Sequence, residues 1–487
     1  MLINAEVLLQ YQRCKRRPYL DSRGDKGQRD AADYLLLKLQ QDKIAHQMRI
    51  LAEFTYQRPD YPRGDWLLGQ AATLELMQQG VECIHQGVLL ATTKQEYTLF
   101  SRPDLLLKRP GNSGFGDWMY VPLSIELGKR PKQEYQVIAA FHAQVLATVQ
   151  QAELETAWLI LRDKEANYPV DLSKWTPLMQ RIMQEYIETQ GKDEAPEVFI
   201  SRQKCSLCHW HSACYTYAKS QKHLSLLPGV TPGRYTQLKT LDITSLESLA
   251  QANPTELENL PGFEREVAPN LILQAQSLLL NRPLRLPVPH EDDYTSHSLL
   301  YRSKESSVEI YFDIEAQPDL NLDYLLGVLI VDRQANTEYF YSLLAESLED
   351  EKIIWQQFIQ LVSLYPDAPI YHFCVYEFDT IKRLGKLYRT PYSYIQPILH
   401  RFVDIYEELI LQVALPVESY ALKAIARWLD FEWRDQEASG AKCIYWYDQW
   451  LQTGDRTFLE AIQRYNEDDC RATRSVKDWL VNFLANS

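Results

Sequence analysis

The most regular hydrophobic pattern in the chain covers residues 308–315, a run of apolar, β-branched and aromatic side chains that ends in two acids. Such a run predicts a buried strand. Asp313 and Glu315 are two positions apart, so their side chains share one face at the end of that strand. Two buried carboxylates beside each other are costly unless a cation or a proton compensates them. The pattern therefore predicts a divalent metal site.

The residues after this strand predict an α/β domain that ends in helices. A buried strand at 368–374 leads into a helix that carries Glu377. Beyond that helix the chain is predicted to be helical, including 402–405. In the last helix Tyr465 and Asp469 are four positions apart and face the same way. The other predicted elements are strands at 323–331 and 338–344, as antiparallel neighbours, and a helix at 349–364.

The first part of the chain predicts a second α/β fold with acids of its own. Asp104 lies in a predicted strand at 97–106, and the next predicted strand, at 120–129, contains Glu126 and Lys129. The two acids would hold Mg²⁺, and the lysine would polarise the attacking water or the phosphate. The other predicted elements are helices at 31–50, 71–79 and 133–149 and a strand at 81–90.

A short cysteine motif follows this part of the chain. Cys205, Cys208 and Cys214 are spaced C-x₂-C-x₅-C. Thiolates at such spacing rarely serve packing alone, and soft sulfur ligands select iron–sulfur clusters or zinc. Zinc is an alternative because His209 and His211 lie within the motif. The remaining interpretation is a helical cap with unligated cysteines.

Residues 221–285 contain an approximate repeat of short helices. The sequence LLPGV around Gly229 recurs as NLPGF around Gly262. Between and after these glycines, Ser, Thr and Asn residues and a proline mark helix starts. The pattern predicts paired short helices joined by glycine turns, with a proline-containing linker from residue 281 onward.

Composition and charge narrow the classes of function. Acidic residues outnumber basic ones by 65 to 51, so the net charge of −14 excludes binding to nucleic acid by overall charge. Local basic patches exist, for example at 15–17 and 129–132. No apolar run has the length of a membrane span, and the first charges follow the first apolar residues, so we expect a soluble, cytoplasmic protein that does not bind membranes.

The acids of the last third resemble the motifs of the DEDD, or DnaQ-like, 3′–5′ exonucleases of the YprB type, which have an RNase H-like fold. Asp313-x-Glu315 matches the first motif, and His372-x₃-Tyr376-Glu377 matches the second, with glutamate where aspartate is usual. Tyr465-x₃-Asp469 matches the third in its tyrosine variant. The resemblance implies two Mg²⁺ or Mn²⁺ ions about 4 Å apart. The implied metal ligands are Asp313, Glu315, Glu377 and Asp469, with Tyr465 orienting the water.

The first part resembles the RecB-like branch of the PD-(D/E)XK nucleases. Pro103-Asp104 and Glu126…Lys129 match its first two elements, although the family places one residue fewer between its second acid and the lysine. Gln136 and Phe141 take the place of its Gln/aromatic helix motif, and Asp30 is the residue available for its earlier metal-binding helix. The cysteine pattern resembles the iron-staple nucleases of this family, which implies a [4Fe–4S] cluster held by Cys14, Cys205, Cys208 and Cys214.

Residues 221–285 resemble tandem helix–hairpin–helix modules, in which backbone N–H groups near Gly229 and Gly262 would hold a DNA phosphate. We therefore expect an α/β multidomain protein: a PD-(D/E)XK restriction-endonuclease-like domain at 1–220, a small all-α helix–hairpin–helix domain at 221–285, a linker at 286–305 and an RNase H-like exonuclease domain at 306–487. The expected function is a metal-dependent nuclease, preferring DNA, in DNA repair or processing. The alternatives are a ribonuclease and a non-catalytic DNA-end or junction-binding protein with decayed sites.

Overall fold

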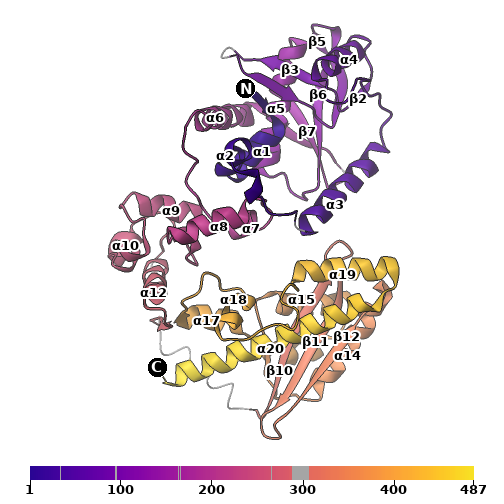
Figure 1. The fold of residues 1–487 in the computed structure, drawn as a ribbon. Coiled ribbons are helices and arrows are strands. Elements are labelled where there is room, and N and C mark those ends of the chain that lie inside the picture. Colours follow the sequence, from indigo (N-terminus) through magenta and orange to yellow (C-terminus); the bar gives the residue numbers. More distant parts are fainter. Residues whose placement is uncertain are drawn as a thin grey trace. The chain divides into compact units, whose positions relative to one another are not determined.

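The computed structural model describes residues 1–32, 34–93, 96–162, 164, 166–264, 266–287 and 306–486 (Figure 1). The chain divides into two compact units, Met1–Tyr217 and Ala218–Ser487. Each unit is described by itself. Most of the predicted linker at 286–305 lies outside the described residues.

The first unit is built on a five-stranded sheet in the order β2-β5-β6-β7-β8. Strands β5 and β6 are antiparallel, and β6 and β7 are parallel. A three-stranded sheet, β1-β4-β3, accompanies it. The helix α5 packs against β6 and β7 and is buried over most of its surface, as expected for a core helix.

The elements of this unit are β1 (Leu2–Asn4), α1 (Ala5–Arg13), α2 (Arg16–Arg23), η1 (Lys26–Gln28), α3 (Tyr34–Leu51), α4 (Trp66–Gln78), β2 (Cys83–His85), β3 (Leu89–Thr92), β4 (Thr98–Ser101), β5 (Leu105–Ser113), β6 (Gly116–Glu126), α5 (Gln133–Gln150), β7 (Thr156–Leu161), β8 (Tyr168–Asp171), α6 (Leu172–Gln190), α7 (Arg202–Cys205) and α8 (His211–Ser220).

The strand predicted at 81–90 is wrong, because the chain turns within it. Gln86 has a φ of 53°, in the left-handed region. The next residue, Gly87, has no room for a side chain, since an added Cβ would lie 2.8 Å from Leu106 Cδ1. The backbone N–H of Gln86 donates to the carbonyl of Asp104 at 3.0 Å. The turn therefore separates β2 from β3 and fixes the backbone at Asp104.

The helical part of the second unit contains two glycine turns. Gly229 and Gly262 have φ values of 87° and 84°, which glycine adopts without strain. Arg234 donates to the carbonyl oxygens of both glycines, at 2.8 Å each. The two turns are thus held together by one guanidinium. The elements here are η2 (Leu224–Leu226), α9 (Pro232–Lys239), α10 (Leu246–Ala250), α11 (Pro254–Glu258) and α12 (Val267–Leu280).

Helix α12 is joined to the sheet-containing part of the same unit. The Gln274 amide donates to the carbonyl of Leu415 at 2.5 Å and accepts a hydrogen bond from Tyr420 at 2.6 Å. The short strands β9 (Leu284–Arg285) and β15 (Val413–Ala414) then pair antiparallel.

The sheet of the second unit has the order β12-β11-β10-β13-β14. The first three strands are antiparallel neighbours, as predicted, and β13 and β14 are parallel to β10. The long helix α20 packs against β10 and β11 (Figure 1). The prediction of helix at 402–405 is wrong for its first three residues, because Phe402–Asp404 form the edge strand β14. A segment of three residues is too short for its hydrophobic period to distinguish strand from helix.

The remaining elements of this unit are β10 (Val308–Gln317), β11 (Leu322–Asp332), β12 (Thr337–Leu344), η3 (Leu348–Asp350), α14 (Glu351–Ser363), β13 (Ile370–His372), α15 (Tyr376–Leu387), α16 (Tyr392–Leu399), α17 (Ile405–Gln412), α18 (Leu422–Trp428), α19 (Gly440–Thr453) and α20 (Arg456–Asn486).

Candidate functional site

Strand β10 separates apolar and acidic side chains by its alternation. Ile310, Phe312 and Ile314 enter one hydrophobic core. Residues of the opposite parity face the other side, where Tyr311 joins a second core that includes residues of α20. Asp313 and Glu315 belong to this second parity. Burial on both faces of the strand therefore places the two carboxylates beneath α20.

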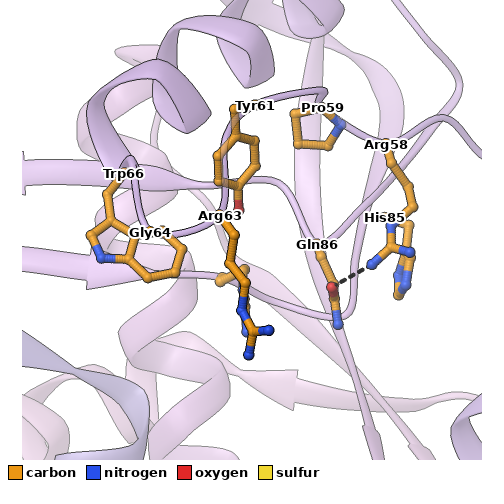
Figure 2. A pocket seen from close by; sticks show the side chains of 9 residues that line it. Arg58, Pro59, Tyr61, Arg63, Gly64, Trp66, His85 and Gln86 are labelled. Atoms are coloured by element: carbon orange, nitrogen blue, oxygen red, sulfur yellow. Dashed lines mark hydrogen bonds between the residues drawn. The ribbon is translucent and has the colours of Figure 1, made fainter.

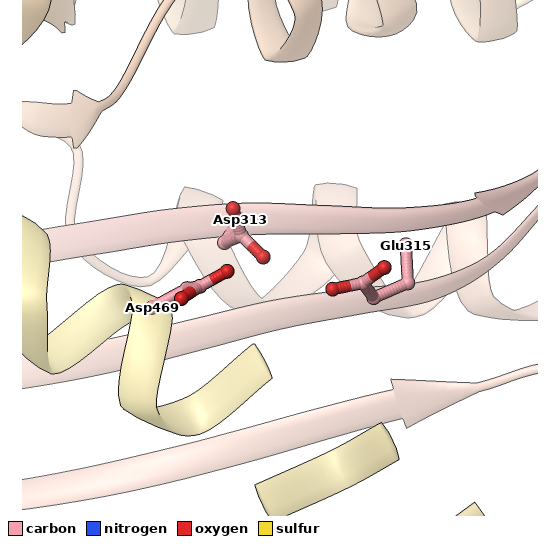
Figure 3. A group of neighbouring side chains, drawn as sticks. All are labelled: Asp313, Glu315 and Asp469. Carbon is pink, nitrogen blue, oxygen red and sulfur yellow. The ribbon is translucent and has the colours of Figure 1, made fainter. Parts of the chain in front are cut away.

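Helix α20 supplies a third acid to this place. One oxygen from each of Asp313, Glu315 and Asp469 lies within 4.8 Å of the others (Figure 3). In Figure 3 the two strand acids and the helix acid turn toward one another. The Asp469 carboxylate is oriented by Trp433, whose indole N–H donates to it at 2.7 Å. We call Asp313, Glu315 and Asp469 the acidic triad.

The electrostatics of the triad reflect like charges that are buried together. Burial raises the pKa of Asp313 well above its ordinary range, and Asp469, Glu315 and Glu377 raise it further. Burial also raises the pKa of Glu315 well above its ordinary range, and the charges of Asp469 and Glu377 raise it further. Burial also raises the pKa of Asp469, to about 7, although hydrogen bonds from Trp433 and Tyr465 and the charge of Lys423 oppose this shift. Because all three pKa values are raised, binding of a proton or of a cation stabilises the site.

The third acid on β10, Glu309, is a neutralised carboxylate and serves as a comparison for Asp313 and Glu315. Glu309 is 2% exposed and bonds to the ammonium of Lys477 and, at 2.6 Å, to the guanidinium of Arg333. Within the described residues, no such ion pair is made by Asp313 or Glu315. The chain thus neutralises the acid outside the triad and leaves the two strand acids of the triad without a basic partner.

Asn466 completes the surroundings of Asp313. Its amide N–H donates to Asp313 Oδ2 at 2.6 Å. This approach depends on Gly327, the residue opposite Asp313 in β11, because an added Cβ there would lie 1.6 Å from Asn466 Oδ1. Sequence reasoning missed both residues. The only signal was a glycine inside an otherwise apolar strand, which marks a close approach.

Glu377 lies close to the triad but outside the group of atoms within 4.8 Å. It is the second residue of α15, which follows a turn in which Cys374 has a φ of 80°, a strained conformation for a residue with a side chain. The Asp404 carboxylate holds this turn by accepting from the Cys374 N–H at 2.9 Å. Burial raises the pKa of Glu377, and His372, whose Nδ1 lies 3.6 Å from the carboxylate, opposes that shift.

Two acids that lie near the site residues in sequence, Asp468 and Asp379, do not belong to the acidic triad. Asp468 is buried but paired with Arg434, whose Nε donates to it at 2.8 Å. Asp379, two positions after Glu377, is exposed. A cation that sequence reasoning missed is Lys423, whose Nζ lies 5.4 Å and 5.5 Å from the ring centres of Trp433 and Tyr465.

In the first unit, Asp104 and Glu126 are brought together at the β5–β6 ladder. Asp104 accepts hydrogen bonds from the Ile125 N–H at 2.6 Å and the Gln47 amide at 2.9 Å. Burial raises the pKa of Glu126 to about 7, and the Asp104 charge adds to this shift. The cation nearest to Glu126 is one that sequence reasoning missed: Lys43 Nζ, on α3, lies 3.8 Å from its carboxylate.

The other residues that the sequence assigns to this site have the following surroundings. Lys129 is exposed, in the turn after β6. The Gln136 amide donates to the carbonyl of Pro131 at 2.9 Å, and Phe141 is fully buried in the core. Asp30, considered for the metal-binding helix, lies in none of the described helices and accepts from the Ser212 N–H at 2.9 Å, beside the cysteine motif.

The four predicted cluster cysteines interact electrostatically. Burial raises the pKa of Cys205, of Cys208 and of Cys214, the last to about 11, and the charge of Cys14 adds to each shift. In the described part of the chain, no group of three cysteines or histidines brings its ligand atoms within 4.8 Å of one another. An iron–sulfur cluster is therefore not seen directly. His209 Nε2 lies 2.6 Å from Asp21.

Comparisons with known proteins identify the C-terminal fold. Residues 310–481 match the family model RNase_H_2, described as the RNase_H superfamily. A solved structure named "Crystal structure of SSO0001" aligns with 44% of this chain and 86% of its own, at 13% identity and a TM-score of 0.24. No curated protein matches. The protein is thus an α/β multidomain protein with a C-terminal RNase H-like domain whose acidic triad is consistent with a metal-dependent nuclease. None of the described helices is both long and apolar enough to span a bilayer.

Proposed function

We propose that this protein is a Mg²⁺- or Mn²⁺-dependent exonuclease that removes nucleotides from the 3′ end of DNA. The observation that carries the proposal is the contrast on β10: Glu309 is neutralised by Lys477 and Arg333, whereas the half-buried Asp313 and the buried Glu315 have no basic partner in the described residues. Carboxylate oxygens are the ligands that these cations prefer. The donor set therefore fits divalent metal ions.

The side chains of the site have distinct proposed roles. Asp313, Glu315, Glu377 and Asp469 would hold two ions, which supply positive charge that activates a water and stabilises the leaving 3′ oxygen. Asn466 keeps Asp313 in position through its 2.6 Å bond. Trp433 does the same for Asp469. Tyr465, whose hydroxyl is near Asp469, would orient the attacking water.

The upstream parts are proposed to deliver the nucleic acid. Residues 1–220 would be a PD-(D/E)XK domain, in which Asp104 and Glu126 hold a metal ion and Lys129 or Lys43 supplies the positive charge. Residues 221–285 would be helix–hairpin–helix modules that hold DNA phosphates near Gly229 and Gly262. The paired turns, fixed by Arg234, favour this interpretation. These modules are the reason for preferring DNA over RNA, because the RNase H fold serves both substrates.

Cys14, Cys205, Cys208 and Cys214 are proposed to hold a [4Fe–4S] cluster that stabilises the first unit. Each thiolate of such a cluster binds a different iron, so the sulfur atoms are further apart than the ligands of one ion. Zinc remains the alternative, although one ring nitrogen of His209 is engaged by Asp21. Protein purified without oxygen should be brown and contain iron and sulfide. Cys14→Ala should lose the iron and Cys83→Ala should keep it, whereas colourless zinc protein would overturn the assignment.

The nuclease proposal is tested with DNA and RNA oligonucleotides labelled at either end, in Mn²⁺ or EDTA. Release of a 3′ label that needs metal and is lost in Asp313→Asn supports the proposal. Asp379→Asn is the matched control, because it removes an exposed acid of the same domain. Faster degradation of RNA would favour a ribonuclease. Tight binding of DNA without cleavage would favour the non-catalytic alternative.

A further inference from the structure

A cavity of about 500 Å³ lies in the first unit (Figure 2). Its walls come from the segment between α3 and α4, from the turn after β2 and from the residue that follows β4. The lining residues are Arg58, Pro59, Tyr61, Arg63, Gly64, Trp66, His85, Gln86 and Arg102. We call this cavity the arginine pocket. Neither the acidic triad nor the Asp104 and Glu126 carboxylates line it.

The arginine pocket carries positive charge that no ion pair of the described residues neutralises, although the charge of Arg102 opposes the rise in the Asp104 pKa that burial causes. None of the ion pairs between described residues involves Arg58, Arg63 or Arg102. Arg58 instead donates to the Gln86 side chain at 2.7 Å (Figure 2). In a chain of net charge −14, such a concentration of unpaired arginine attracts an anion.

Aromatic rings accompany the arginines. The Trp66 ring is 4.8 Å from that of Phe100 and 6.3 Å from that of Tyr61, and Arg102 lies 5.7 Å from its centre. The position of Tyr61 depends on Gly69, where an added Cβ would lie 3.0 Å from the tyrosine ring. The Trp66 and Tyr61 rings are thus held by packing, and both line the cavity.

Guanidinium groups and aromatic faces together are suited to a nucleotide. Arginine binds phosphate oxygens through paired N–H donors, and a base stacks on tyrosine or tryptophan. The volume lies within the range of small-ligand sites. A base can reach an aromatic wall only when it is unstacked, which a single strand permits and a duplex does not. An acidic peptide would satisfy the arginines but leave the rings unused.

We infer that the arginine pocket binds one nucleotide unit of single-stranded nucleic acid, with its phosphate on Arg58, Arg63 and Arg102 and its base against Trp66 and Tyr61. The pocket adjoins the Asp104 site through the backbone, since His85 Nδ1 and the Gln86 N–H both bond to the Asp104 carbonyl, at 2.8 Å and 3.0 Å. The inference does not depend on cleavage. It stands even if the nuclease proposal fails.

The test uses the full-length chain in EDTA, so that no metal-dependent cleavage occurs. Binding of a fluorescent single-stranded oligonucleotide is measured by anisotropy over a series of salt concentrations. Arg63→Gln should weaken binding about tenfold, because a charge-assisted bond to phosphate is lost. The slope of log K against log salt should fall by about 0.7, the value for one phosphate contact on a single strand. Arg63→Lys should keep the slope.

The matched control is Arg181→Gln, an exposed arginine on α6 whose loss removes the same charge from the same unit. An equal effect of both substitutions, or no effect of Arg63→Gln, would overturn the inference. A photoreactive base in the oligonucleotide gives a local readout, since crosslinks should map to Tyr61 or Trp66. Crosslinks that map only elsewhere, or a duplex that competes as well as the single strand, would refute base stacking. A nucleoside monophosphate that competes better than the strand would overturn the inference of strand binding and assign the pocket to free nucleotides.

Discussion

The two pairs of acids in this chain differ in what surrounds them. In the first unit, Asp104 and Glu126 have an amide donor, a backbone N–H and the ammonium of Lys43, 3.8 Å from Glu126. In the second unit, Asp313 and Glu315 are joined by a third acid, Asp469. The first site thus has a cation paired with one of its two carboxylates, whereas no described ion pair joins the three acids of the triad and the charge of Lys423 only partly opposes the raised pKa of Asp469.

This difference has a physical consequence for what each site needs. Burying several carboxylates without compensation costs free energy, and the pKa values rise until a proton or a metal ion restores balance. The pKa of Asp469 is raised although three neighbours, Trp433, Tyr465 and Lys423, favour its charged form. The acidic triad therefore depends more strongly on a bound cation than the Asp104 site does, and this contrast can be tested directly.

The largest expected effect separates the two sites by activity. Asp313→Asn should lower metal-dependent 3′ degradation at least a thousandfold, or about 4 kcal/mol in the barrier, because it removes charge that holds the ions. Asp104→Asn, assayed in parallel, should leave that activity within about twofold, since Asp104 belongs to the other unit. An equal loss in both variants would show that the two sites act as one.

The next effect is the pH dependence of stability without metal. The pKa of Asp469 is raised from 3.8 to about 7 in the folded state. Between these values the unfolded chain has released the proton and the folded chain retains it, so stability falls as the pH rises through this window. A tenfold difference in proton affinity between the folded and unfolded states corresponds to about 1.4 kcal/mol, so the shift of Asp469 alone corresponds to a loss of about 4 kcal/mol in the stability of the second unit between roughly pH 4 and pH 8.

Urea unfolding in EDTA at several pH values measures this loss. Asp469→Asn should be more stable than the wild-type chain at high pH and should have a smaller pH dependence, the rest of which comes from Asp313 and Glu315, whose pKa values burial also raises. Saturating Mn²⁺ should stabilise the wild-type chain, because it binds only the folded site, and should have little effect on the variant. Stability that increases with pH over this window would refute the electrostatic description of the triad.

A smaller effect concerns the contact that orients Asp313. Gly327→Ala would place a Cβ 1.6 Å from Asn466 Oδ1, so the amide must move away from Asp313. We expect a loss of about 1–3 kcal/mol in stability, as for other overpacked sites, together with lower activity. Gly440→Ala is the matched control, because its Cβ would contact nothing within 4 Å. Adding Asn466→Ala should restore stability without restoring activity. Full activity of Gly327→Ala would exclude a role for this contact.

Local periodicity accounts for the parts of the site that could be predicted from sequence. The alternation around Asp313 predicts a strand with both acids on one face, and the four-residue spacing of Tyr465 and Asp469 predicts one face of a helix. Both predictions hold because they concern neighbours along the chain. The antiparallel partners of β10 were predictable for the same reason, since connected strands usually pair.

The remaining features depend on contacts between distant segments. Asn466 reaches Asp313 only because β11 has a glycine opposite it, and no period in either segment reports that pairing. Lys43 approaches Glu126 from a helix 83 positions earlier in the chain. The arginine pocket collects residues from three separate segments. In each case the residue types were visible, but their common location follows from the packed fold.

The smallest expected effect tests whether Lys43 belongs to the Asp104 site. The Lys43 side chain is 45% exposed, so its attraction to Glu126 at 3.8 Å is weakened by solvent. A double-mutant cycle with Lys43→Met and Glu126→Gln should give a coupling of about 0.5–1 kcal/mol at about pH 8, measured by urea unfolding. At about pH 5 the coupling should vanish, because Glu126, whose pKa is about 7, is then protonated in the folded state. A coupling that is absent at the higher pH, or unchanged between the two pH values, would assign the neutralising charge of this site to another residue, with Lys129 as the next to test.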